Sequence, residues 1–408
     1  MRNKHTPDIR FPGFTGEWEQ RKLGDLADFS KGNGYTKGDL TDEGKPIILY
    51  GRLYTKYETV IETVNTFTIK KEKSVISKGN EVIVPASGET SEDISRASVV
   101  SKPGIILGGD LNIVRPSNEI DPVFLALTIS NGKQQKELSK RAQGKSVVHL
   151  HNSDLKEVNL HFPKKEEQTK ISSFFKQLED TIAFHQQELT TLKQTKRGFL
   201  QKMFPKEGES VPEIRFPGFT GEWEEYKLEE LAEIVRGASP RPIQDPKWFD
   251  KNSEIGWLRI ADVTEQDGRI HQLEQKISKA GQAKTRVLTE PHLLLSIAAT
   301  VGKPVVNYVK TGVHDGFLIF MNPKFDMEFM FQWLEMFRPK WKKYGQPGSQ
   351  VNLNSDLVKS QEILIPSKEE QKTIGNFFKQ LDDTIALHQH ELDALNQTKK
   401  AFLQKMFA

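Results

Sequence analysis

The sequence predicts a mixed α/β protein in which α+β globular domains accompany a long intramolecular antiparallel two-helix coiled coil, all within a pseudo-twofold internal repeat. Three observations predict this fold class. An eleven-residue string occurs twice, a heptad-patterned helix occurs twice, and short apolar strand patterns lie between these blocks. Because a tandem repeat decides the whole architecture, it is the first feature to establish.

The repeat is visible in two pairs of blocks. The string Ile9–Glu19 returns unchanged at Ile214–Glu224, 205 residues later. A second pair begins at Pro163 and Pro366, and about 29 of its 43 paired positions are identical, far more than unrelated segments share. The stretches between the blocks have only scattered matches. Each half is therefore a variable globular part held in a repeated frame.

These blocks divide the chain into six predicted segments. They are an N-terminal arm (1–20), a first globular domain (21–162), a central repeated helix (163–204), a linker with a second arm (205–225), a second globular domain (226–365) and a C-terminal repeated helix (366–408).

The repeated helix has the four-three spacing of a coiled-coil seam. Both copies interrupt the seam at the same two places, with His185 and Lys196 in the first and His388 and Lys399 in the second. A polar seam residue fixes register at a cost in stability. The apolar seam comprises Ile171, Phe175, Leu178, Ile182, Leu189, Leu192, Phe199 and Met203, then Ile374, Phe378, Leu381, Ile385, Leu392, Leu395, Phe402 and Met406.

The orientation of the two helices follows from chain connectivity. Each helix would be roughly 50 Å long at 1.5 Å per residue. The second globular part begins where the first helix ends and finishes where the second begins, and antiparallel helices make those two points neighbours. Antiparallel packing would put the globular parts at opposite ends of a rod. The linker 205–212 with the arm after it could also span a parallel pair, so that alternative stays open.

The globular parts show short strand patterns flanked by Gly, Pro or Asn. Strands are expected at 81–84, 104–107 and 111–114, then at 255–260, 292–297, 304–309 and 317–321. Helices are expected at 122–129, 133–141 and 327–337.

Polar clusters occupy matching places in the two halves. Lys and Arg neutralise phosphates, while Arg, Asn and Gln can read base edges, so these clusters are candidate DNA contacts. Solvated surface loops are the alternative interpretation. The candidates are Lys31, Asn33, Tyr35, Lys37, Lys140, Arg141, Lys145 and Ser146 in the first half, and Arg236, Ser239, Arg241, Lys342, Lys343, Tyr344, Ser349 and Gln350 in the second.

Composition and motifs exclude several classes of function. The formal charge is only +3 and cysteine is absent, which rules out disulfides, thiolate zinc sites and cysteine nucleophiles. No run of about 18 apolar residues predicts a membrane span, so a cytoplasmic protein is expected. Gly144-Lys145-Ser146 lacks the earlier glycine of a phosphate-binding loop, and Asp245–Trp248 matches a methyltransferase element only faintly. No catalytic residue, metal site or cofactor of this chain's own is expected.

The whole arrangement resembles the specificity subunit of a type I restriction-modification enzyme. The resemblance rests on the Pro-x-Lys-Glu-Glu-Gln start of each helix, the Phe-x-x-x-Leu-x-x-x-Ile run after it, and the alternation of variable part and repeated frame. The strings Leu294–Lys303 and Arg236–Arg241 are also typical of that family's target-recognition domains.

The resemblance implies that segments 21–162 and 226–365 are target-recognition domains, each reading one half of a bipartite site in double-stranded DNA. It implies that the paired helices set the spacing and dock two modification (methyltransferase) subunits, which restriction (translocase and nuclease) subunits join. S-adenosylmethionine, ATP and Mg²⁺ would then belong to those partners. From another class, a cytoplasmic coiled-coil scaffold with two peptide-binding domains is the alternative, and a self-contained DNA enzyme would need a catalytic motif that the sequence does not show.

Overall fold

The computed structural model describes residues 6–142, 144, 147–341 and 353–407. The chain forms two compact units. Unit 1 contains Met1–Gln186 with His390–Ala408, and unit 2 contains Gln187–Gln389. Among the described residues, no helix is both long and apolar enough to cross a bilayer.

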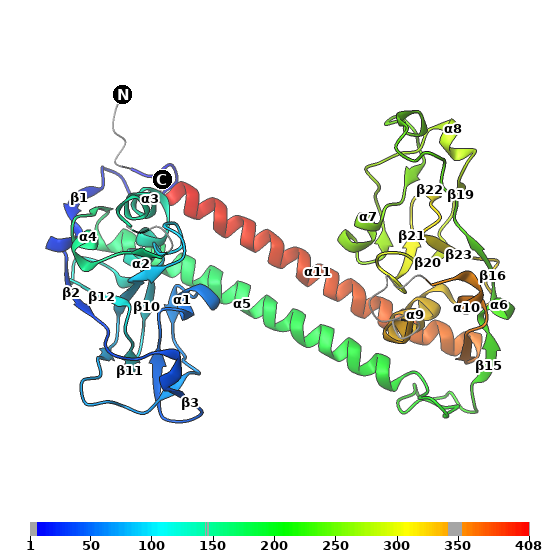
Figure 1. The fold of residues 1–408 in the computed structure, drawn as a ribbon, viewed down its shortest axis with the longest axis horizontal. Coiled ribbons are helices and arrows are strands. Elements are labelled where there is room, and N and C mark those ends of the chain that lie inside the picture. Colours follow the sequence, from blue (N-terminus) through cyan, green and yellow to red (C-terminus); the bar gives the residue numbers. More distant parts are fainter. Residues whose placement is uncertain (1–5, 143, 145–146, 342–352, 408) are drawn as a thin grey trace. The chain divides into compact units, whose positions relative to one another are not determined.

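Two long helices run through the division between the units (Figure 1). They are α5 (Lys165–Lys202) and α11 (Lys368–Met406). Neither contains proline, and each has two glutamates in its first turn, where the helix dipole favours negative charge. Unit 1 contains the first part of α5 and the last part of α11, while unit 2 contains the remaining parts.

The helices are antiparallel within each unit. In unit 1 the rings of Phe174 and Phe402 lie 5.0 Å apart, and Lys399 donates to Glu179, so residue numbers rise along α5 as they fall along α11. In unit 2 Phe199 contacts Phe377 and Lys196 pairs with Asp382, so the two helices run in opposite directions there as well. The predicted fold class, with its antiparallel helix pair, is confirmed.

The globular part of unit 1 has two five-stranded sheets. The first has the order β2-β12-β8-β10-β5, and the second β3-β6-β4-β11-β7. Their strands are β2 (Ala27–Lys31), β3 (Leu40–Thr41), β4 (Lys45–Ile48), β5 (Val60–Ile61), β6 (Phe67–Thr68), β7 (Ile76–Lys78), β8 (Glu81–Pro85), β10 (Ser98–Val100), β11 (Pro103–Leu107) and β12 (Leu111–Pro116). All five residues of β8 are buried, which explains the apolar run that follows Glu81 in this strand.

Shorter elements complete unit 1. Helix α2 begins after Asp121, whose carboxylate accepts from the backbone N–H groups of Val123 and Phe124, the usual capping arrangement. The elements are β1 (Glu19–Lys22) paired with β14 (Asn159–Phe162), β9 (Ser87–Gly88) paired with β13 (Val148–His149), η1 (Leu23–Asp25), η2 (Lys37–Asp39), α1 (Arg52–Thr55), α2 (Pro122–Ser130), α3 (Gly132–Arg141) and α4 (Asn152–Lys156).

The globular part of unit 2 has sheets of order β16-β23-β20-β21-β18 and β17-β22-β19, with β15 paired to β24. Its elements are β15 (Glu224–Lys227), α6 (Leu228–Leu231), β16 (Glu233–Arg236), η3 (Pro246–Trp248), β17 (Gly256–Trp257), α7 (Ile260–Glu265), β18 (Arg269–Ile270), α8 (Lys279–Gln282), β19 (Arg286–Leu288), β20 (Leu293–Ser296), β21 (Pro304–Asn307), β22 (Thr311–Val313), β23 (Phe317–Met321), α9 (Met327–Trp341), α10 (Ser355–Lys359) and β24 (Glu362–Ile365). The strand expected at 255–260 is shorter than predicted, because α7 begins at Ile260.

The main five-stranded sheets of the two globular parts have the same topology although their sequences differ. In unit 1 the pairs β2-β12, β12-β8 and β8-β10 are antiparallel and β10-β5 is parallel. In unit 2 the corresponding pairs β16-β23, β23-β20 and β20-β21 are antiparallel and β21-β18 is parallel. The duplication therefore includes the main sheet of each globular part, while the second sheet has five strands in unit 1 and three in unit 2.

The repeated motif at the start of each long helix has a structural explanation. Gln168 donates to the Pro163 carbonyl and accepts from the backbone N–H of Asp121. Gln371 makes the same bonds with Pro366 and Asp326. Because each glutamine is buried, its amide must be satisfied within the protein. The motif thus locks the helix start onto the N-terminus of α2 or α9.

The glutamate before each glutamine clamps the repeated arm. Arg10 forms two hydrogen bonds with Glu167, at 2.8 and 2.6 Å, and Arg215 does the same with Glu370 at 2.7 and 2.7 Å. Both glutamates are almost fully buried, so each bidentate pair fixes an arm against its helix.

Candidate nucleic-acid interface

The first-half candidates around the end of β2 divide between surface and core. Lys31 and Lys37 are exposed, and the Asn33 side chain donates to the Lys73 carbonyl. Tyr35 is only 6% exposed, and its hydroxyl hydrogen-bonds with Ser74. In this structure Tyr35 holds the loop in place, and Lys31, Asn33 and Lys37 are the exposed candidates.

The next candidates lie at the end of α3. Lys140 is exposed, and Arg141 donates to Glu137 at 2.9 Å and to the Glu157 carbonyl at 3.3 Å. Arg141 is therefore already engaged within the domain, while Lys140 is available to a ligand. Several other candidates lie outside the described residues, namely Lys145, Ser146, Lys342, Lys343, Tyr344, Ser349 and Gln350.

In unit 2 three candidates converge on one residue, Asp315, which sequence reasoning missed. Ser239 donates to Asp315 at 2.7 Å and Arg241 donates at 2.6 Å, while Arg236 donates to the Asp315 backbone carbonyl at 2.7 Å. Asp315 lies 74 residues after Arg241, so no local spacing could have indicated the contact. The structure thus brings together the three residues predicted at the end of β16.

The electrostatics of this cluster favour an ionised Asp315. Burial raises the pKa of Asp315, but the hydrogen bond from Ser239 and the positive charge of Arg241 outweigh it, so that pKa lies below its ordinary value. The Arg241 side chain remains 74% exposed. One terminal nitrogen of its guanidinium donates to Asp315, and an exposed guanidinium is a group that can read a base edge.

The loop that carries these residues is held by backbone hydrogen bonds where it leaves β16. The Gly237 N–H donates to the Phe317 carbonyl and the Ala238 N–H to the Val313 carbonyl. A Cβ atom at Gly237 would lie 2.1 Å from the His314 carbonyl oxygen, so only glycine allows this close approach. The cluster is therefore presented by a rigid loop, as a reading site requires.

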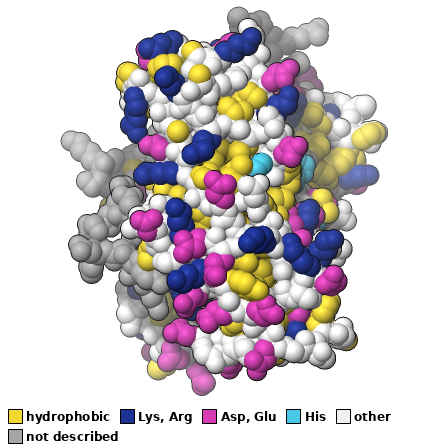
Figure 2. All heavy atoms as spheres, turned by 90° about the vertical axis from the view of Figure 1, so that its right-hand side faces the viewer, with side chains coloured by type: hydrophobic (Ala, Val, Ile, Leu, Met, Phe, Trp, Pro, Cys, Tyr) yellow, Lys and Arg dark blue, Asp and Glu magenta, His cyan; other side chains and the backbone are white. Residues whose placement is uncertain are grey.

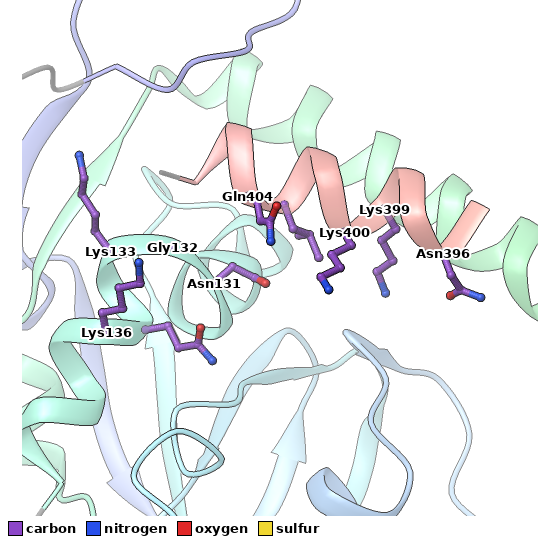
Figure 3. A pocket seen from close by; sticks show the side chains of 10 residues that line it. Asn131, Gly132, Lys133, Lys136, Asn396, Lys399, Lys400 and Gln404 are labelled. Atoms are coloured by element: carbon purple, nitrogen blue, oxygen red, sulfur yellow. The ribbon is translucent and has the colours of Figure 1, made fainter. Parts of the chain in front are cut away.

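A second basic site lies in unit 1, between α3 and α11 (Figure 3). Its cavity has a volume of about 730 Å³. Four lysines and four carboxamide side chains are among the ten lining residues, which are Asn131, Gly132, Lys133, Gln135, Lys136, Asn396, Lys399, Lys400, Leu403 and Gln404. None of the pocket lysines was among the predicted DNA contacts.

Elsewhere the charges are mixed. On the face drawn in Figure 2, Lys and Arg side chains are interspersed with Asp and Glu, as the small formal charge of +3 leads one to expect. A nucleic acid would therefore be recognised through local clusters and not through a broad positive field.

The predicted seam residues differ in burial along each helix. Ile171, Phe175, Leu189 and Met203 of α5 are buried, as are Ile374, Phe378, Leu392 and Met406 of α11. The other apolar seam residues are half-buried, namely Leu178, Ile182, Leu192, Phe199, Leu381, Ile385, Leu395 and Phe402.

The two lysines of the seam both form ion pairs across it. Lys399 donates to Glu179 at 2.6 Å in unit 1, and Lys196 lies 2.5 Å from Asp382 in unit 2. Burial raises the pKa of Asp382, but the charge of Lys196 and its hydrogen bond outweigh it, so that pKa lies below its ordinary value. Arg269, from β18, also contacts Asp382 at 3.0 Å. The helix pair is thus tied to the globular part through charged groups.

Fold and site together define a class of protein: a tandem-repeat protein with two α/β domains of one topology, a repeated antiparallel helix frame, and different polar clusters on the two domains. The family model of the type I restriction modification DNA specificity domain matches residues 15–194 and 220–397. These two matches cover most of the chain, which belongs to the type I restriction-modification DNA specificity family. Its function is recognition of a DNA sequence within such a system.

Full-length relatives agree with this assignment. A protein of Methanocaldococcus jannaschii named as the MjaX specificity subunit is 24% identical, with 95% of this chain and 92% of the relative covered. The type I restriction enzyme MjaVIII specificity subunit of the same organism is 20% identical, with 95% and 91% covered.

Solved structures show the same fold. The S subunit of the M. genitalium type I system matches with a TM-score of 0.64 at 16% identity, over 99% of both chains. A chain from a study of complex assembly and conformational transition in the type I system matches with a TM-score of 0.55 at 17% identity, over 98% of this chain and 99% of the other.

Proposed function

We propose that each globular part reads one half of a bipartite site in double-stranded DNA. The observation that carries this proposal is the shared topology of two domains whose loop clusters differ: the basic group of Arg236 and Arg241 around Asp315 has no sequence match in unit 1. Two domains with one scaffold and different polar loops are suited to two different half-sites.

A domain exchange tests this division of labour. Residues 21–162 would be replaced by the corresponding segment of another family member, and the recognised motif would be determined with the modification subunits present. One half of the motif should change and the other should stay. A change in both halves would contradict independent reading, and a wild-type complex without sequence preference would favour a peptide-binding scaffold.

We propose further that the paired helices set the spacer between the half-sites. A helix rises about 1.5 Å per residue and a base pair about 3.4 Å. Removing one heptad from α5 together with the paired heptad from α11 should therefore shorten the preferred spacer by about three base pairs. The measurement is methylation of a series of duplexes with different spacers. An unchanged optimum would refute the spacing role.

The helices also carry a repeated exposed surface that packing does not explain. We call it the outer patch: Gln177, Asp180, Thr181 and Phe184 on α5, and Gln380, Asp383, Thr384 and Leu387 on α11. The spacing places each set on one helix face. Phe184 is 58% exposed and Leu387 is 57% exposed. Other exposed pairs differ between the copies, such as Thr169 and Lys372, or Thr191 and Ala394.

Three of the four outer-patch pairs are identical and the fourth, Phe184 and Leu387, is apolar in both copies, which supports docking of the same partner twice. We assign the outer patch to two modification subunits, one on each long helix. These partners would bring S-adenosylmethionine and methyl transfer, and restriction subunits would bring ATP, Mg²⁺ and cleavage. The chain itself would contribute recognition and assembly.

The number of modification subunits that bind to the chain tests the role of the outer patch. Phe184→Glu or Leu387→Glu alone should lower the number of bound modification subunits from two to one, and the double variant should bind none, as measured by light scattering on a sizing column. Thr191→Glu with Ala394→Glu is the matched control and should still bind two. Retention of both partners by the Phe184→Glu, Leu387→Glu variant would rule out this surface.

A further inference from the structure

The basic pocket of unit 1 is built by two segments far apart in the sequence. Residues 131–136 begin α3, and residues 396–404 belong to the last turns of α11. Phe407 holds the two together, because its ring packs on those of Phe124 and Phe175 and its carbonyl accepts from the Lys133 N–H. A Cβ atom at Gly132 would lie 1.5 Å from that carbonyl oxygen. The contact is therefore close, and the pocket walls are fixed relative to one another.

The lining of the pocket is strongly cationic. Lys133, Lys136 and Lys400 form no ion pair with any described residue, and only Lys399 is paired, with Glu179. Among the described residues, those that line the cavity include no acidic side chain. Like charges gathered in one concavity repel one another, and an anionic ligand removes that cost.

The remaining polar groups suit an anion with several oxygen atoms. Gln135 and Gln404 carry amides that can donate, while the amides of Asn131 and Asn396 each already donate one hydrogen bond to a backbone carbonyl and retain a second N–H. The labelled residues reach the pocket from the start of α3 and from α11 (Figure 3). Leu403 is the one large apolar residue in the lining. A pocket for a protein segment usually needs an aromatic or aliphatic anchor site, which this lining does not provide.

The lysines also continue beyond the pocket. Lys133, Lys136 and Lys140 lie three and four residues apart along α3, so they follow one face of the helix. Lys140 is exposed and was predicted from the sequence to contact DNA. A row of cations that leads out of a cavity along a helix follows the shape of a nucleic-acid backbone better than that of an isolated small anion.

We propose that this pocket binds phosphodiester groups of the DNA backbone, with Lys133, Lys136 and Lys400 as the contacting cations. The inference rests on the proposed function and adds to it a site that positions the duplex without reading its sequence. Backbone contacts fix register and orientation while base contacts specify. Such a site would hold the DNA beside the first globular domain, whichever sequence that domain reads.

The test uses the complex of the full chain with its modification subunits. Binding to two duplexes, one with the recognised motif and one without it, would be measured over a series of salt concentrations. In the triple variant Lys133→Gln, Lys136→Gln, Lys400→Gln, the slope of log K against log salt should fall by about 2.7 in magnitude, because each neutralised phosphate contributes about 0.9. Affinity should fall by the same factor on both duplexes.

The matched control removes three lysines at the start of α5, in Lys164→Gln, Lys165→Gln, Lys170→Gln. None of these lysines lines the pocket or forms an ion pair with a described residue, and the variant should keep the wild-type slope. An equal fall in the control would reduce the effect to net charge and overturn the proposal. An unchanged slope in the pocket variant would overturn it as well.

Two other outcomes reassign the pocket. Loss of a modification subunit from the pocket variant would show that an acidic protein segment occupies it. A thermal shift with inorganic phosphate that the variant loses, without any change in DNA binding, would identify a site for free phosphate. If the wild-type complex showed no preference for any sequence, the proposed function would fail, whereas an unchanged slope on a working complex refutes the pocket alone.

Discussion

The two seam lysines are related by the repeat, yet their loss should have unequal effects. In unit 1 Glu179 accepts from Lys399 at 2.6 Å and from the Thr59 hydroxyl at 2.6 Å. Replacing Lys399 by methionine therefore leaves Glu179 with a single neutral donor. In unit 2 Asp382 keeps the hydrogen bonds from Arg269 at 3.0 Å and Gln332 at 2.8 Å when Lys196 is replaced.

The magnitude follows from burial and from the partners that remain. Two unit charges about 3 Å apart attract by about 5 kcal/mol at an effective dielectric constant of 20, and desolvation offsets most of this in a partly buried pair. Glu179 is 22% exposed and Lys399 is 24% exposed. We expect Lys399→Met to cost about 1–2 kcal/mol, and Lys196→Met to cost less, about 0.5–1 kcal/mol, because Asp382 stays charge-paired.

Native-state hydrogen exchange measures the two effects separately, since the chain forms two units and a single unfolding transition is not assured. In Lys399→Met, exchange of α11 around residue 399 should accelerate by about 5–30-fold. In Lys196→Met, exchange of α5 around residue 196 should change less. Lys196 and Asp382 are the more buried pair, at 17% and 14% exposed. If Lys196→Met gave the larger effect, burial and not the number of remaining partners would control the cost.

Three further outcomes are expected. Arg10→Ala should leave the buried Glu167 carboxylate with no guanidinium partner, cost about 2–3 kcal/mol, and make the N-terminal arm more sensitive to limited proteolysis. Asp315→Asn should raise affinity for non-specific duplex, because a negative charge is removed, while lowering selectivity for one half-site only; equal changes on every duplex would reduce Asp315 to a bulk charge effect. The pKa of Asp382 is held below its ordinary value. The ionised carboxylate should therefore stabilise unit 2 fully above about pH 4, and this stabilisation should be lost as pH falls through the folded-state pKa. Hydrogen exchange of α11 near residue 382, measured at several pH values, would follow the loss.

The frame was predictable because its signals are local or repeated. The heptad spacing and the eleven-residue string specify two equivalent helices and two equivalent arms without any knowledge of tertiary structure. Chain connectivity then favoured the antiparallel pair that both units show. Strand positions were also largely predictable, since β8 and β23 are buried apolar runs with clear ends.

Strand order and long-range polar contacts were beyond sequence reasoning. The parallel pairing of β5 with β10 and of β18 with β21 joins strands separated by a long stretch of chain, and periodicity carries no information about which strands are neighbours. Asp315 was missed for the same reason, as were Lys133, Lys136 and Lys400. Tyr35 looked like a surface residue by composition, but its ring lies in a small buried cluster with Ile47 and Ile106.

Identity between the two copies has two physical origins, and the structure separates them. At buried positions it reflects packing: Glu167 and Gln168 satisfy the arm and the start of α2, and Glu370 and Gln371 do the same with the second arm and α9. Substitution there would leave buried polar groups unpaired. At the exposed outer patch three of the four pairs are identical and the fourth, Phe184 and Leu387, is apolar in both copies. We propose that a common partner constrains this surface. The globular parts show the opposite pattern, because the strand order of the main sheet is the same in both while the loop sequences differ. A protein that keeps similar partner-facing surfaces on its two helices while its loops diverge can acquire a new half-site without losing its assembly.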